Sequence, residues 1–309
     1  MAADLLVRAS APVRICDNGG WTDTWFGGPG RVLNLAVSPR VEVVVRDAAA
    51  EVPAPSNPLV LAALEEYPPM RSVEVHIRSD APAGSGLGTS AAVSVALVAA
   101  FSRLGGEHLD PMKLARAAHY LEADLVGVEC GVQDHVSAAF GGINFITIDA
   151  YPSFTVEPLA PWPELDGLLT VVYLGQPHDS SGVHEEVIDN GDTGVFERLR
   201  LAALDAKTAV AGRDLIEFGR SLVSNTTAQA DLHPGVVGRD ALVVIEAARR
   251  LGALGWKVNG AGGDGGSVTV LSADPDSRRR FDDWVHRYRR YRVLPVAASS
   301  EGARIEQIR

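Results

Sequence analysis

The sequence predicts an α+β fold with mostly antiparallel or mixed sheets. Strand-like and helix-like stretches are mixed along the 309 residues, and the strand pairs lie close in sequence instead of alternating strictly with helices. Hydrophobic residues make up 46% of the chain and charged residues 22%, which is typical of a globular protein with a sizeable core. The length suits one large domain or two ordinary ones.

Hydrophobic periodicity and helix-capping residues define the elements of the first half. Val73, Val75 and Ile77 alternate with polar residues, which predicts a half-buried strand. Asp110 and Pro111 are typical of a helix N-terminus. The expected elements are strands at 5–15, 41–47, 72–80 and 143–149, a short helix within 58–67, and helices at 90–104, 110–125 and 131–141.

A second half of the chain is expected to begin near Tyr151. Its expected elements are a strand at 168–175, a polar loop at 176–187, helices at 196–211, 213–227 and 239–251, a glycine loop and strand within 256–274, and a final helix and strand ending at 299. The basic run at 277–292 is interleaved with aromatic residues at helical spacing. It could bind anions, but an amphipathic helix with a solvated arginine face is the favoured interpretation.

Charge and cysteine content limit the classes of function. The net charge is −11, from 28 basic and 39 acidic residues, which argues against nucleic-acid binding because phosphate contacts need a basic face. Two cysteines far apart, Cys16 and Cys130, suit a reducing compartment. The N-terminus lacks an apolar signal segment, and no apolar run reaches the length of a membrane span. We expect a soluble cytoplasmic protein with no nucleic-acid or membrane partner, and the sequence leaves a homodimer open.

A glycine-rich loop, "PAGSGLGTSAA" at 82–92, lies between a predicted strand and a predicted helix. Exposed N–H groups at such a helix N-terminus favour a negatively charged ligand, and glycine allows phosphate oxygens to approach the main chain. The loop lacks the lysine of a Walker loop and the third glycine of a dinucleotide-binding loop, since Thr89 stands there. A phosphate bound here would need a metal for charge neutralisation. A helix simply capped by Thr89 or Ser90 is the alternative.

This loop resembles the second motif of the GHMP kinases, the superfamily of galactokinase, homoserine kinase, mevalonate kinase and phosphomevalonate kinase. Three further stretches resemble its other motifs in the same order, at 10–23, 121–142 and 258–271. The resemblance implies a two-domain fold, with residues 1–160 resembling the second domain of a small-subunit ribosomal protein and 161–309 a ferredoxin-like α/β sandwich. It places the active site in the cleft between them.

The resemblance also implies roles for individual residues. Asp134 matches the catalytic aspartate, whose carboxylate can accept or orient the proton of a substrate hydroxyl, and Arg14 matches its basic partner. Glu122 and Ser90 match the ligands of the Mg²⁺ that accompanies ATP, although Asp124 and Glu129 lie nearby. The residues expected to contact ATP are Pro82, Gly84, Ser85, Gly86, Leu87, Gly88, Thr89 and Ser90.

The expected substrate is a sugar. Asp23 follows Arg14 by nine residues, as in sugar kinases in which this aspartate contacts hydroxyl groups. Gly19 and Gly20 replace the glutamate of galactokinases and Trp21 their histidine, which argues against galactose. Trp21 or Trp25 could stack on a sugar or belong to the core. The other expected substrate contacts are Thr22, His178, Gly262, Gly263 and Asp264.

The loop around Trp21 and the segment at 291–305 most resemble the branch that holds heptose 7-phosphate kinase and fucokinase. That branch implies phosphorylation of the anomeric hydroxyl of a heptose or related sugar, with fucose, arabinose, glucuronate or galactose as alternatives. At 173–187 the branch has a Gly-x-x-Arg turn, where this chain has His178 and Asp179. If that arginine binds a substrate phosphate, its absence favours a neutral or uronic sugar.

Two readings from other functional classes compete with a kinase. Ser90 in "GTSAA" resembles the nucleophile of a serine hydrolase, but no triad spacing accompanies it. A binding protein without catalysis would not need Arg14, Ser90, Glu122 and Asp134 together. Zinc binding by His178 and His184 lacks a complete tetrahedral ligand set.

Overall fold

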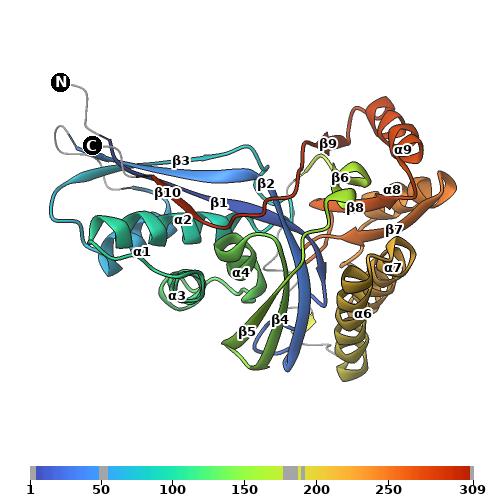
Figure 1. Ribbon diagram of the computed structural model, residues 1–309, viewed down its shortest axis with the longest axis horizontal. Helices are drawn as coiled ribbons and strands as arrows, with labels where there is room; N and C mark the ends of the chain where they lie inside the picture. Colours follow the sequence, from blue (N-terminus) through green and yellow to red (C-terminus); the bar gives the residue numbers. More distant parts are fainter. Residues whose placement is uncertain (1–4, 49–54, 177–186, 189–191, 307–309) are drawn as a thin grey trace.

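Two antiparallel sheets organise the chain (Figure 1), which confirms the predicted α+β class. The computed structural model describes residues 5–48, 55–176, 187–188 and 192–306. The first sheet has six strands in the order β10-β1-β2-β4-β5, with β3 paired to the far end of β2. Its strands are β1 (Leu5–Asn18), β2 (Gly30–Asp47), β3 (Val73–Ser79), β4 (Ile143–Ala150), β5 (Ser153–Leu159) and β10 (Arg304–Glu306).

Helices α2 (Thr89–Leu104) and α4 (Gln133–Phe140) pack on the first sheet. Helix α1 (Pro58–Glu66) packs against α2, and α3 (Pro111–Tyr120) packs against α2 and α4. The central helix α2 is buried along residues 91–102, and its side chains share one apolar cluster with β1 and β2. Because so many of its side chains are small, α2 approaches the sheet closely. Burial of this helix fixes its N-terminus, where the first glycine loop ends.

The second sheet has four strands in the order β7-β8-β6-β9. They are β6 (Leu169–Tyr173), β7 (Ala253–Val258), β8 (Ser267–Ser272) and β9 (Arg292–Leu294). Helices α8 (Arg239–Arg250) and α9 (Pro275–Arg287) pack on one face and share an apolar cluster with it. Helix α7 (Leu215–Leu232) packs on β7 and on α6 (Thr193–Gly212), and α6 packs on β2. Both helices also contribute to the apolar cluster of the first sheet, so the two halves share a core.

The predicted split at residue 160 remains a prediction, but the strands add one qualification. β5 lies in the first sheet, and β10 returns from the C-terminal end of the chain to pair with β1, with Arg8 opposite Glu306. The C-terminal segment therefore crosses back to the first half (Figure 1). A strand of three residues is too short for its alternation of polar and apolar residues to give a sequence signal for this return.

The structure changes one predicted helix and confirms another. The helix expected at 110–125 becomes a π turn at Leu121–Leu125, in which Val126 N donates to Leu121 O. The basic run at 277–292 contributes to the amphipathic helix α9, whose Phe281 and Val285 are buried, and this confirms the favoured interpretation. Within the part of the chain that the structure describes, every helix is too short or too polar to cross a bilayer.

Candidate active site

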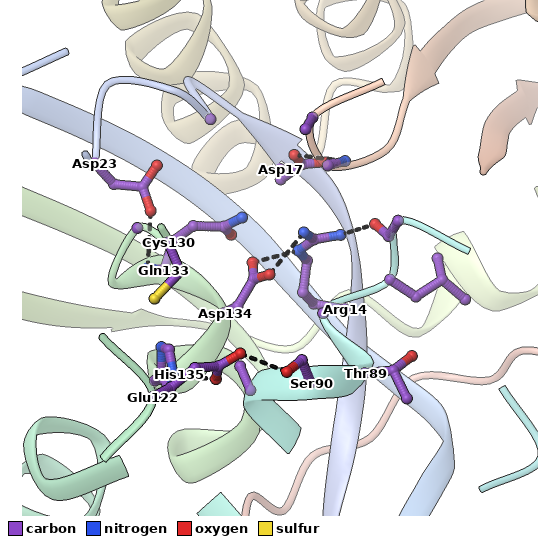
Figure 2. Close-up of a pocket in the computed structure, with 18 of the residues that line it drawn as sticks. Arg14, Asp17, Asp23, Thr89, Ser90, Glu122, Cys130, Gln133, Asp134 and His135 are labelled. Carbon is purple, nitrogen blue, oxygen red and sulfur yellow. Dashed lines mark hydrogen bonds and ion pairs between the residues drawn. The ribbon is translucent and has the colours of Figure 1, made fainter. Parts of the chain in front are cut away.

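A cavity of about 370 Å³ lies where the two glycine loops meet strand β1 (Figure 2). Its walls come from the first half through β1, the loop at 84–90 and the start of α4, and from the second half through Gly260 and Ala261. Backbone contact joins the two loops: a Cβ on Gly86 would lie 2.6 Å from Asn259 O. Ser267 Oγ also donates to Ser85 O at 2.6 Å.

The first glycine loop presents unsatisfied polar groups at the cavity. Gly84, Gly86 and Gly88 all have positive φ, which L side chains rarely adopt. Ser85 Oγ and Thr89 Oγ1 are buried without a hydrogen-bond partner among the described residues. Buried hydroxyl groups normally have partners. Two such groups beside the N-terminus of α2 fit the oxygens of a phosphate.

Arg14 and Asp134 form a two-point ion pair at the centre of the cavity. Arg14 Nε lies 2.7 Å from Asp134 Oδ1, and Nη2 lies 2.9 Å from Oδ2. Arg14 Nη1 also donates to the carbonyl of Gly86, so one guanidinium joins the acid to the glycine loop. Burial alone would lower the pKa of Arg14, but Asp134 and Asp17 raise it, and the side chain stays charged.

Asp134 also touches the glycine loop directly. It stands in the first turn of α4, and a Cβ on Gly88 would lie 3.1 Å from its Oδ2. The carboxylate side chain is 26% exposed, so it is open to a ligand in the cavity. An acid held beside a phosphate-sized cradle can accept a proton from a bound hydroxyl group.

Glu122 faces the start of α2 from the π turn. Ser90 Oγ donates to its Oε1, while Ser94 Oγ and His135 Nε2 lie 2.9 and 2.8 Å from its Oε2. Burial opposes ionisation of Glu122, but its bonds to His135 and the two serines lower the pKa overall. The π turn thus holds Glu122 beside the N-terminus of α2, and such turns occur frequently at functional sites.

Figure 2 shows Asp23 on the side of Asp134 that lies away from Ser90 and Glu122. Gln133 N donates to its Oδ2 at 3.0 Å, and Gly131 leaves room for the carboxylate, since a Cβ there would lie 2.0 Å from Oδ2. Burial and the charge of Asp134 raise the pKa of Asp23 to about 6, although the Gln133 bond opposes the shift. Asp23 is 3% exposed and lines the cavity.

A buried ion pair joins the two halves behind the cavity. Lys257 Nζ on β7 lies 3.2 Å from Asp17 Oδ1 on β1, and both side chains are at most 1% exposed. Asp17 Oδ2 accepts from Gly260 N at 3.0 Å, and Lys257 also donates to Gln229 Oε1 at 3.0 Å. Burial lowers the pKa of Lys257, while Asp17 raises it. Asp17 therefore fixes the second glycine loop against β1.

Most of the predicted ATP-loop residues line the cavity, together with Arg14, Gly20, Trp21, Asp23 and Asp134. Glu122 lines it as well, and of the predicted ATP contacts only Pro82 does not. Trp21 is 5% exposed and packs in an apolar cluster, whereas Trp25 is 56% exposed and donates through Nε1 to Glu129.

Several of the predicted substrate contacts do not line the cavity. Gly19 N donates to Asn225 Oδ1, and Thr22 Oγ1 donates to Gly19 O, so these two residues shape the loop. Gly262 and Gly263 pack on Val236 instead, with Gly263 N donating to Val236 O at 2.7 Å. Asp264 follows them and is exposed. His178 and His184 lie outside the described residues.

The sequence analysis missed three residues of the site: Asp17, Lys257 and His135. Asp17 and Lys257 are 240 positions apart, and nothing in one sequence pairs them. A role for His135 could have been predicted from the sequence, because it directly follows Asp134 on the helix that approaches Glu122. For Lys257, the available signal was a charged residue among the apolar residues of "GWKVNG", since a buried charge needs a partner of opposite charge.

The donor set suits Mg²⁺ bound together with a nucleotide. Among the described residues no cluster of three or more acidic, histidine or cysteine ligands exists. Mg²⁺, however, is commonly held by one or two protein oxygens and substrate phosphates. Ser90 and Glu122 offer two adjacent oxygens at the cavity beside the glycine loop, and Glu122 is kept ionised. The residues present therefore fit this group.

Comparison with known proteins agrees with the geometry. A profile of the GHMP kinases N terminal domain matches residues 57–142. Mevalonate kinase from Thermococcus sibiricus is 30% identical over 239 residues, which are 74% of this chain and 68% of that protein. Mevalonate kinase from Pyrococcus furiosus is 32% identical, covering 76% of this chain and 70% of that protein. L-fucokinase/L-fucose-1-P guanylyltransferase from Bacteroides fragilis is 25% identical, and the match covers 90% of this chain and 36% of that protein.

Solved structures share the fold. A D-glycero-D-manno-heptose 1-phosphate kinase from Bacteroides thetaiotaomicron superposes with a TM-score of 0.77 at 22% identity, covering 98% of this chain and all of that chain. Galactokinase from Lactococcus lactis, complexed with galactose, gives a TM-score of 0.75 at 17% identity, with 96% and 95% covered. At these identities the likeness concerns the fold alone.

Proposed function

Because the chain belongs to the GHMP kinase family, we propose that it transfers the γ-phosphoryl group of ATP to a sugar hydroxyl. The first candidate is the anomeric hydroxyl of a heptose or related sugar. The observation that carries the proposal is the position of Asp134, which is paired with Arg14 and lies against Gly88 of the glycine loop. An acid and a phosphate-sized cradle thus share one cavity.

The glycine loop would hold the triphosphate. The N–H groups at the start of α2 and the unpartnered hydroxyls of Ser85 and Thr89 would donate to phosphate oxygens. Arg14 would lie beside the transferred group and stabilise its developing charge. Mg²⁺, held by Ser90 and Glu122, would offset the charge of the β- and γ-phosphates when bound.

Asp134 would act on the acceptor. Its carboxylate accepts the proton of the sugar hydroxyl as the sugar oxygen forms its bond to the γ-phosphorus. The bond from that phosphorus to the bridging oxygen breaks at the same time, and ADP leaves with the electron pair. Arg14 keeps the carboxylate charged and oriented until the proton is transferred.

The sugar would lie between Asp134 and Asp23. A carboxylate accepts hydrogen bonds from two hydroxyl groups, which suits a polyol, and Trp21 provides an apolar surface beside it. Mevalonate is the second candidate acceptor, favoured by the relatives at 30% and 32% identity. Asp23 argues against it, because an acidic group disfavours a carboxylate nearby.

The test is transfer of label from [γ-³²P]ATP to a panel of sugars and to mevalonate in the presence of Mg²⁺. The proposal expects an acid-labile sugar 1-phosphate, identified by phosphorus NMR, and little product with mevalonate. If mevalonate were the only acceptor that gave product, the kinase assignment would stand, but the proposal of a sugar as acceptor would be wrong. Hydrolysis of simple esters, lost in Ser90→Ala, would instead support the serine hydrolase reading.

A further inference from the structure

The charges that line the cavity are strongly unequal. Five carboxylates face it, and Arg14 is the one Lys or Arg among the described residues that lines it. The acidic residues are Asp17, Asp23, Glu122, Glu129 and Asp134. An additional negative charge on a bound molecule would therefore enter a site that already has a surplus of its own sign.

Arg14 in the cavity and Lys257 next to Asp17 are already paired. Arg14 is occupied by both oxygens of Asp134 and by the carbonyl of Gly86. Lys257 is 0% exposed behind Asp17, which it neutralises. After these pairings Asp23 and Glu129 remain as uncompensated charges beside Asp134, while Glu122 belongs to the proposed Mg²⁺ position.

The two ends of the cavity differ in what they offer an anion. Figure 2 shows Ser90 and Thr89 on one side of Asp134 and Asp23 and Cys130 on the other. The first side has the N-terminus of α2 for the triphosphate. On the second side the N-terminus of α4 is already met by acidic groups, because Gln133 N donates to Asp23 and Asp134 stands in the first turn.

The internal chain segments outside the described residues contain no lysine or arginine that could compensate this charge. Residues 49–54, 177–186 and 189–191 contain no lysine or arginine, and the two terminal segments contain only Arg309. His178 and His184 are the only residues of 177–191 that can become cationic, and an unperturbed histidine is mostly neutral above pH 7. The sequence of these internal segments thus holds no fixed cation for an acceptor phosphate.

On these grounds, and resting on the proposed function, we infer that the acceptor is an uncharged sugar. Phosphorylated sugars, uronic acids and carboxylate acceptors such as mevalonate are rejected, because their negative charge would lie beside the uncompensated carboxylates of Asp23 and Glu129. An anion taken from water into such a site loses its solvation without gaining a partner. A neutral sugar instead donates its hydroxyl hydrogens to the same carboxylates. This selects the neutral alternative from the two that the segment at 173–187 left open.

The test uses acceptors in matched pairs that differ only in charge. The pairs are galactose and galacturonate, glucose and glucuronate, mannose and mannose 6-phosphate, and a manno-heptose with its 7-phosphate. ADP release is followed at saturating ATP and Mg²⁺. We expect the neutral member of every productive pair to have a kcat/KM at least about 100-fold above its anionic partner, which corresponds to two negative groups at close range.

A charge variant separates electrostatics from shape. Glu129→Gln keeps an oxygen for the Trp25 indole and removes one negative charge from an exposed position, so folding should be preserved. It should narrow the ratio of neutral to anionic kcat/KM several-fold. Glu65→Gln, an exposed change on α1 outside the cavity, should leave the ratio unchanged.

Each failure has its own meaning. Higher kcat/KM for the anionic members would overturn the inference while the kinase assignment stands. A ratio that Glu129→Gln leaves unchanged would also overturn it, because charge would not be its cause. Absence of phosphoryl transfer to any acceptor of either kind would contradict the proposed function itself.

Discussion

Arg14 donates two hydrogen bonds to the carboxylate of Asp134, 2.7 Å from Nε to Oδ1 and 2.9 Å from Nη2 to Oδ2. Its third nitrogen, Nη1, donates to the carbonyl of Gly86. The planar guanidinium thus sets the distance between the acid and the glycine loop. A lysine offers one point charge in place of this fork. The pair links β1, α4 and the loop before α2 in one geometry.

Asp23→Asn is expected to stabilise the protein while it weakens sugar binding. The folded protein holds the Asp23 proton more tightly than the unfolded chain, because its pKa is raised to about 6. Its contribution to stability is therefore lost as the pH rises from about 4 to about 6, and ionised Asp23 destabilises the fold above that window. Asparagine cannot ionise, so at pH 7.5 we expect a gain on the order of 2 kcal/mol in the free energy of unfolding.

Urea unfolding at pH 7.5 and pH 4 measures this difference, which should vanish at the lower pH. At pH 7.5 sugar affinity should be weaker in the variant than in the wild type, and the wild type should itself lose affinity below pH 6, where Asp23 becomes protonated. Asp264→Asn is the control, since Asp264 is exposed and lies outside the cavity. An equal stability gain in Asp264→Asn would show that burial of Asp23 is not the cause.

Gly88→Ala should lower kcat about 10- to 100-fold, because misplacing a catalytic group by a fraction of an ångström is costly. A Cβ at Gly88 would lie 3.1 Å from the Asp134 carboxylate, which must shift to accommodate it. Gly106→Ala is the matched control: its φ of +86° resembles the +71° of Gly88, but nothing lies within 4 Å. Both changes should cost about 1–2 kcal/mol of stability. Equal kcat values in the two variants would argue against contact with Asp134.

Glu122→Gln should raise the Mg²⁺ concentration needed for half-maximal activity at least about tenfold, because a ligand carboxylate is replaced by a weaker amide. The measurement is a Mg²⁺ titration of activity at fixed ATP. Asp124→Asn, an exposed change in the same π turn, should leave the titration unchanged. A shift with Asp124→Asn alone would move the metal ligand to that residue.

Lys257→Met should destabilise the protein by about 3–5 kcal/mol, because it leaves Asp17 buried without a counter-charge. Adding Asp17→Asn to Lys257→Met should recover a large part of this loss, since no buried charge then remains. Thermal or urea unfolding of the two single variants and the double variant gives the coupling free energy. Additive losses would show that the two residues act independently.

Where local pattern and chemistry coincide, the sequence indicated groups that the structure brings together. Glycines at 84, 86 and 88 before a small-residue helix indicated the cradle, and the matched motifs indicated Asp134 and Arg14, which the structure brings into contact. The spacing from Asp134 also favoured Glu122 over Asp124, and Glu122 is the one that accepts a hydrogen bond from Ser90. These features depend on short segments with fixed backbone requirements.

The predictions were incomplete where tertiary contacts decide. The orientation of Gly262 and Gly263 depends on Val236, which belongs to a distant segment. Glu122 in the π turn contacts Ser90, Ser94 and His135, and helical periodicity carries no information about these contacts. The Asp17–Lys257 pair needs both sheets to be in place before it exists.

Phosphoryl transfer to neutral sugars by Asp134→Asn, compared with the wild type, tests the central claim most directly. Kinetics with [γ-³²P]ATP should show a fall in kcat of about 10²–10⁴-fold, with MgADP affinity within a few-fold of the wild type and an unchanged circular dichroism spectrum. Asp264→Asn should retain wild-type turnover. Undiminished transfer to a sugar by Asp134→Asn would contradict the account, because the carboxylate beside Arg14 and Gly88 would then not take part in the reaction.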